Sequence, residues 1–177
     1  MRSTSAIKRI SAAAAAFVLV ASSAPSQQTA LQDPLVERLV GTWVLRGTIG
    51  GQQTTHDIVA DWVLGREYVR LHEVSREKDA TGRPAYEAIV FIGRDPGSDG
   101  YACLWLDSTG GGGLAGQAIG HAKRGVDAMA FVFKGSDGSL FHTTFAYDKA
   151  VDTWQWLMDG EEGGKLVPFA RVRLTKK

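Results

Sequence analysis

The sequence predicts an all-β protein, an antiparallel up-and-down barrel of eight to ten strands preceded by a short N-terminal helix. Three observations support this fold class: ten short strand-like runs, turn-forming sequences between them, and no long helical pattern separating one run from the next. Parallel strands need a long crossover, whereas antiparallel strands are joined by tight turns. We therefore expect antiparallel pairing throughout, and closure into a barrel is the simplest arrangement of so many strands.

The strand-like runs are rich in β-branched and aromatic residues, and the segments between them are rich in glycine, proline, aspartate and serine. The runs cover residues 42–49, 54–64, 66–76, 85–93, 101–107, 114–122, 126–134, 139–147, 153–158 and 166–174. The turns are Gly50-Gly51, residues 81–84, 95–100 and 136–138, and Asp159-Gly160.

The alternation of side chains along the runs supports strands. It does not decide which face of each strand points into the barrel, because both faces carry apolar residues. In the run 139–147, Phe141 and Phe145 share one face, while Leu140 and His142 share the other. A barrel of this size often encloses a cavity, so interior side chains can serve a ligand as well as a core.

The chain divides into a signal peptide at residues 1–26, a linker with a short helix at 27–40, and the barrel at 41–177. Asp33 and Pro34 form a typical helix N-cap and first-turn pair. The apolar stripe of the helix is Leu35, Val36, Leu39 and Val40.

The first ten residues contain Arg2, Lys8 and Arg9 and no acid, and an alanine-rich apolar run follows. Small residues from Ala24 to Ser26 then suit a signal peptidase. The apolar run is shorter than the ~20 residues needed to cross a bilayer, which favours a cleaved leader over a retained anchor. We expect a periplasmic or secreted mature protein with no membrane anchor.

Charge and cysteine content exclude several classes of partner. The chain has 20 basic and 19 acidic residues, and loss of the leader leaves 17 and 19. A near-neutral chain has no basic face for nucleic acid or an anionic membrane. Cys103 is the single cysteine, so there is no internal disulfide, and its apolar neighbours indicate a buried thiol. The sequence makes no prediction about oligomeric state.

The histidines do not form a metal-binding pattern. His56, His72, His121 and His142 fall on different runs, and no His-x-His or His-Glu-x-x-His spacing occurs. We therefore predict no metal site. The glycine run 110–113 lacks the partner motifs of an oxyanion or phosphate loop and is interpreted as a loop at the barrel mouth.

Five short motifs, in order along the chain, resemble a bacterial family of lipocalin-like proteins of unknown function. They are Gly41-Thr42-Trp43, residues 61–68, Gly82-Arg83-Pro84, Ile92-Gly93-Arg94-Asp95 and Trp105-Leu106-Asp107-Ser108. Arg94 replaces the tyrosine of the usual Gly-Tyr-Asp, and Gly65 stands alone where two glycines are common. The resemblance implies a calycin-type barrel and no established activity.

The resemblance also implies how one end of the barrel is closed. Gly41 would let neighbouring backbone approach, and the Trp43 indole would plug that end while its N–H finds an acceptor. In lipocalin-like barrels a last-strand arginine commonly stacks on this indole, a role that falls to Arg171 or Arg173.

A second resemblance, to haem-binding barrels of the nitrobindin type, is weaker. Those proteins have a fuller glycine-rich motif around the first tryptophan and a histidine ligand near the last strand, whereas this chain has no histidine after His142. His142 and Met158 are the remaining candidate iron ligands, although a strand methionine is typically core. We predict no cofactor.

Three functional hypotheses follow. The first is a binding protein for a small hydrophobic or amphipathic molecule, with a pocket formed by Trp62, Tyr68, His72, Trp105, Asp107 and Trp156. The second is an enzyme in which Asp107, with His72 or His142, moves a proton. The third is a structural or interaction module with a filled barrel. A cavity on the order of several hundred Å³ would favour the first two.

Export is directly testable. The leader should be removed, so N-terminal sequencing of the mature protein from fractionated cells should find a start between Ala21 and Ala30. A mature protein that still begins at Met1 would contradict this prediction.

Overall fold

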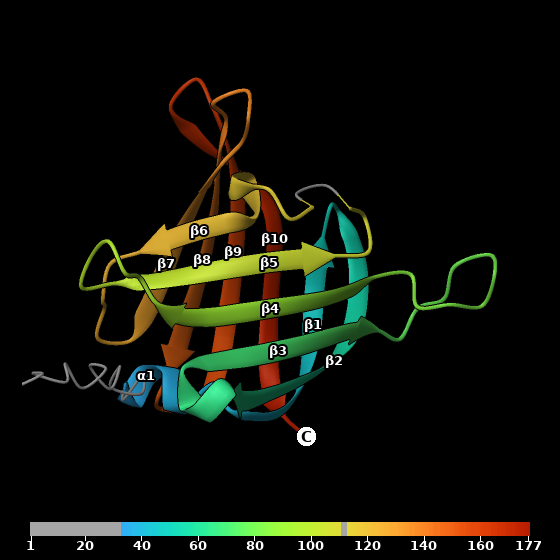
Figure 1. Ribbon diagram of the computed structural model, residues 1–177. Helices are drawn as coiled ribbons and strands as arrows, with labels where there is room; N and C mark the ends of the chain where they lie inside the picture. Colours follow the sequence, from blue (N-terminus) through green and yellow to red (C-terminus); the bar gives the residue numbers. More distant parts are fainter. Residues whose placement is uncertain (1–32, 111–112) are drawn as a thin grey trace, which may run out of the picture.

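The structure is a computed structural model that describes residues 33–110 and 113–177. The proposed signal peptide lies outside the described residues, as do Gly111 and Gly112 within the glycine run. The described chain folds into ten antiparallel strands that close in the order β1-β10-β9-β8-β7-β6-β5-β4-β3-β2 (Figure 1). The all-β, up-and-down fold class predicted from the sequence is confirmed.

Every strand pairs with its neighbours in the chain, and β1 closes the barrel against β10. The strands are β1 (Gly41–Ile49), β2 (Gln52–Val63), β3 (Tyr68–Ser75), β4 (Glu87–Arg94), β5 (Tyr101–Asp107), β6 (Ile119–Ala122), β7 (Ala128–Lys134), β8 (Leu140–Asp148), β9 (Thr153–Glu162) and β10 (Lys165–Lys176). The helical segments are α1 (Pro34–Glu37), η1 (Leu64–Arg66) and η2 (Gly116–Ala118).

Strands β6 and β9 differ most from the sequence prediction. Only Ile119–Ala122 of the run 114–122 is a strand, because η2 occupies the residues just before it. The turn predicted at Asp159-Gly160 is wrong: both residues lie within β9, where they pair with β8 and β10. The chain reverses instead at Gly163 and Gly164, which adopt φ angles of 56° and 76° that favour glycine.

Burial settles which face of each strand points inward. On β3, Leu71 and Glu73 are buried, whereas His72 is directed outward. On β8, Phe145 is buried and His142 lies on the opposite face. Since strand side chains alternate, each of these assignments fixes the direction of the whole strand.

Cys103 on β5 is fully buried, as its apolar neighbours indicate. Burial raises the pKa of the Cys103 thiol, because the charged thiolate is disfavoured away from water. The thiol therefore stays protonated and unreactive at neutral pH.

Helix α1 lies across one end of the barrel (Figure 1). Asp33 caps it, accepting from the backbone N–H groups of Leu35 at 2.9 Å and Val36 at 3.3 Å. The other Asp33 oxygen accepts from the Tyr101 hydroxyl at 2.6 Å, which ties the helix start to β5. In the described chain, no helix has the length and apolar character needed to span a membrane.

Trp43 closes this end of the barrel. Its indole is fully buried, and Nε1 donates to the Leu39 carbonyl just after α1 at 2.8 Å. The buried Trp154 donates in the same way to the Arg38 carbonyl at 3.4 Å. The indoles bury large apolar surfaces and also satisfy backbone carbonyls at the end of the helix.

Two details of this closure differ from the lipocalin-like expectation. Gly41 is needed for its φ of 142° rather than for a close backbone approach, since the nearest atom to an added Cβ is Trp43 Nε1 at 3.8 Å. Neither Arg171 nor Arg173 stacks on Trp43; the cation over the ring is Lys176, with Nζ 5.5 Å from the ring centroid.

The alternation of side chains along β10 explains why a lysine, and not an arginine, lies over Trp43. Leu174 points inward, so the exposed Arg171 and Arg173 point outward. Lys176 follows Leu174 by two residues and is therefore on the same face of β10. It is directly opposite Trp43 in the pairing of β10 with β1.

Trp43→Ala should lower the free energy of unfolding by roughly 3–5 kcal/mol, because it removes apolar burial and leaves a cavity. Denaturant melts measure this loss. Trp62→Ala serves as the control, since Trp62 is only partly buried, and should cost less. A loss below about 1 kcal/mol for Trp43→Ala would contradict the role of the indole as a plug.

Candidate functional site

A cavity of about 850 Å³ occupies the end of the barrel opposite α1. Its walls come from inward-facing side chains near the β1–β2, β3–β4, β7–β8 and β9–β10 connections and from the end of β5. Thr109 and Gln117, on either side of the glycine run, also line it, which places the ends of that loop at the mouth.

Much of the wall is aromatic. Trp105, Phe133, Phe141 and Phe169 contribute ring surface, and Phe141 and Phe169 meet edge to face with centroids 5.6 Å apart. Phe169 is 45 % exposed, which is unusual for phenylalanine and marks the rim. An apolar molecule of moderate size therefore finds a preformed surface here.

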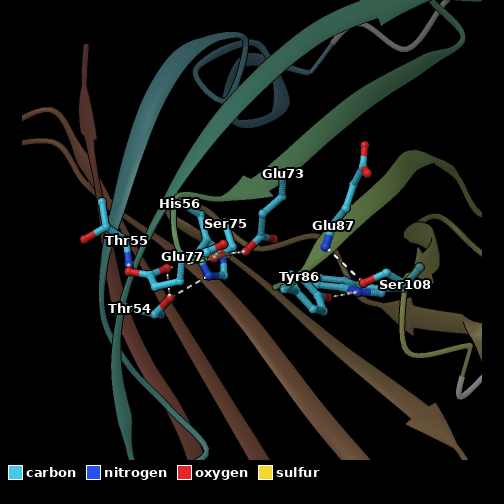
Figure 2. Close-up of polar contacts among 10 residues, drawn as sticks. Thr54, Thr55, His56, Glu73, Ser75, Glu77, Tyr86, Glu87 and Ser108 are labelled. Carbon is cyan, nitrogen blue, oxygen red and sulfur yellow. Dashed lines mark hydrogen bonds and ion pairs between the residues drawn. The ribbon is translucent and has the colours of Figure 1, made fainter. Parts of the chain in front are cut away.

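A buried histidine–glutamate pair forms the polar part of the lining. His56 on β2 and Glu73 on β3 are 3 % and 2 % exposed, and His56 Nδ1 bonds to Glu73 Oε1 (Figure 2). Glu73 is directly opposite Ile58 in the β2–β3 register, so His56 and Glu73 are diagonal neighbours on the inner face.

The hydrogen bonds around His56 determine which of its ring nitrogens carry a hydrogen. The Glu77 carboxylate accepts from the Thr54 hydroxyl at 2.9 Å, so the Thr54 oxygen accepts from His56 Nε2 at 2.8 Å (Figure 2). His56 Nε2 thus carries a hydrogen. Nδ1 and Glu73 then share one further proton, and the pair is neutral overall whichever atom holds it.

Glu77 is held as a carboxylate by donors from two strands. The Ser75 hydroxyl donates to it at 2.7 Å, and Thr54 and the Thr55 backbone N–H add further bonds. These hydrogen bonds, with Ser75 the largest cause, lower the pKa of Glu77 to about 2. The carboxylate is therefore charged at neutral pH.

Tyr86 connects the polar pair to the aromatic wall. Its ring stacks on His56 with centroids 5.6 Å apart, and its hydroxyl accepts from Trp105 Nε1 at 3.1 Å. Burial raises the pKa of the Tyr86 hydroxyl, and the negative charge of Glu73 raises it further. Tyr86 is thus a neutral phenol beside an acidic group.

One oxygen of the pair is left over. Glu73 Oε2 is buried and has no hydrogen-bond partner within residues 33–110 and 113–177, whereas Oε1 is bound to His56. A buried acceptor without a donor is costly, so this atom is the strongest unmet hydrogen-bonding demand in the cavity lining.

The structure brings two of the six predicted pocket residues to the cavity. Trp105 and Asp107, at the end of β5, line it. Trp156 is fully buried behind Trp105, with ring centroids 6.3 Å apart, and packs against Phe145. Its indole N–H, like Glu73 Oε2, has no partner in the described chain.

The other three predicted residues lie outside the cavity lining. Trp62 is at the α1 end, where its indole donates to Glu37 at 3.0 Å under the Arg66 guanidinium. Tyr68 is 40 % exposed at the start of β3. His72 faces outward, with Nε2 2.6 Å from Glu87 Oε1.

The proton-transfer pairs of the enzyme hypothesis are not formed. Asp107 faces the cavity and accepts from Thr109 at 2.8 Å, whereas His72 and His142 bond on the outer face to Glu87 and Glu161.

Sequence reasoning missed His56, Glu73 and Tyr86. The apolar residues Ile58 and Ala60, which alternate with His56, were the available signal for His56. On β3 the predicted pocket used the face that carries Tyr68 and His72. The opposite face of this strand, which carries Glu73, lines the cavity.

No group of three or more histidine, cysteine, aspartate or glutamate side chains gathers as a metal ion would require, within the residues that the structure describes. Comparison of the chain with known protein families and with curated proteins finds no match.

Acid titration tests the Glu77 network. Its pKa falls from an ordinary 4.5 to about 2, so its stabilising contribution is complete above 4.5 and is lost as the pH falls toward 2. Glu77→Gln should therefore lower the thermal midpoint at about pH 6, and the difference from wild type should shrink through that window. Glu162→Gln, at the exposed end of β9, is the control. A difference that does not change with pH would contradict the assignment.

Proposed function

We propose that this chain is an exported, lipocalin-like barrel that binds a small apolar or amphipathic molecule. The observation that carries the proposal is the cavity of about 850 Å³, which joins an aromatic wall to a buried polar group. Ligand pockets of proteins have this size and this combination of surfaces.

The geometry suits an amphipathic molecule in one orientation. The rings of Phe133, Phe141 and Phe169 would hold the apolar body. Glu73 and Tyr86 would meet its polar group, since they lie together on the inner face. The plugged end at Trp43 restricts entry to the opposite mouth.

Two observations favour binding over the alternative hypotheses. A cavity of this volume argues against a barrel filled by its own side chains. The proton-transfer pairs of the enzyme hypothesis are not formed, because Asp107 lines the cavity whereas His72 and His142 pair with Glu87 and Glu161 on the outer face. This favours holding a molecule over transforming it.

Titration with the neutral probe N-phenyl-1-naphthylamine tests the proposal on delipidated mature protein. At micromolar probe concentrations we expect a saturable increase in probe fluorescence. Tryptophan fluorescence should be quenched at the same time, because Trp105 lines the cavity. Trp105→Ala should weaken binding by about tenfold, or ~1.4 kcal/mol, without loss of fold.

Trp62→Ala is the matched control, since Trp62 lies at the α1 end and should leave the affinity unchanged. If nothing saturates below about 1 mM, where binding is worth ~4 kcal/mol, the binding proposal fails in favour of a structural module.

A further inference from the structure

The cavity lining carries charge of a single sign. Its described residues include Glu73, Glu77, Asp107 and Asp137, with His56 as the one histidine and no lysine or arginine. Because His56 and Glu73 are neutral as a pair, the other three carboxylates leave the lining negative. A partly enclosed, aromatic-walled site strengthens such a field relative to open water.

Glu73 supplies a specific acceptor within this field. Its side chain is 2 % exposed, it lines the cavity, and Oε2 has no donor among the described residues. Figure 2 shows the Glu73 carboxylate beside the His56 ring. A ligand that brings a charged N–H donor would satisfy this atom with a charge-assisted hydrogen bond.

The aromatic lining has the same preference. Ring faces attract cations through their electron density, and Tyr86, Trp105, Phe133 and Phe141 all border the cavity. The same rings give no such advantage to a carboxylate, which the surrounding acids would also repel.

We propose that the cavity selects cations: its ligand is a protonated amine on an apolar or aromatic body, with the ammonium group at Glu73 Oε2. This inference rests on the proposed binding function and adds the ligand class. The same charges disfavour fatty acids and other organic anions.

Three matched probes test the selection: 4-phenylbutylamine, 4-phenylbutanol and 4-phenylbutyrate, which share a body and differ in charge. Each is titrated into the wild-type mature protein by calorimetry and by displacement of N-phenyl-1-naphthylamine. We expect the amine to bind at least about tenfold more tightly than the alcohol, and the carboxylate to bind most weakly.

Glu73→Gln should reduce the preference for the amine over the alcohol by about tenfold, because a neutral amide oxygen offers the ammonium no charge-assisted hydrogen bond. Binding of the alcohol reports that the cavity of the variant is intact. Glu87→Gln is the matched control, since Glu87 pairs with the outward-facing His72 and should leave the preference unchanged.

The two proposals fail in different ways. If the neutral probe and the alcohol bind but the wild-type protein does not prefer the amine, cation selection is overturned and the binding function stands. If no probe binds, both are overturned. If Glu73→Gln retains the full preference, Glu73 is not the ammonium site; if this variant does not fold, the wild-type comparison decides.

Discussion

The hydrogen bond from the Trp43 indole to the Leu39 carbonyl is the contact on which the arrangement of this barrel depends. It joins the first strand to the segment after α1; Trp154 on β9 fastens the same segment, and Tyr101 on β5 fastens the N-cap of the helix. Large aromatic groups thus fill one end and satisfy their polar atoms there. The unfilled volume is left at the other end, where the strand connections surround it.

Because side chains alternate along each strand, two chemically similar histidine–glutamate pairs lie on opposite faces of the barrel wall. His56 and Glu73 face inward and are buried, whereas His72 and Glu87 face outward and are about half exposed. An exposed pair contributes little because water screens it. The inner pair is removed from water, so its hydrogen bonds must be met by the protein or by a molecule that enters the cavity.

Stability and binding use different parts of the same interior. The end near α1 is packed with fully buried side chains such as Trp43, Leu45 and Ile58. Toward the mouth the inner face combines aromatic and polar side chains, and within the described residues it retains a buried carboxylate oxygen without a partner. A barrel that only needed to be stable would gain by filling this volume and by replacing Glu73 with an apolar residue.

The sequence by itself determined the class of fold and the capped helix and limited the strands to between eight and ten, because turn residues and alternation act locally. It also singled out Trp43, Trp105 and Asp107, which lie where the strand pattern places them. Tertiary structure decided which face of each strand turns inward, since both faces carry apolar residues. It therefore decided that Glu73 rather than His72 meets the cavity, and that Lys176 rather than an arginine covers Trp43. Such contacts depend on strand register across the barrel, and register is set only when the sheet closes.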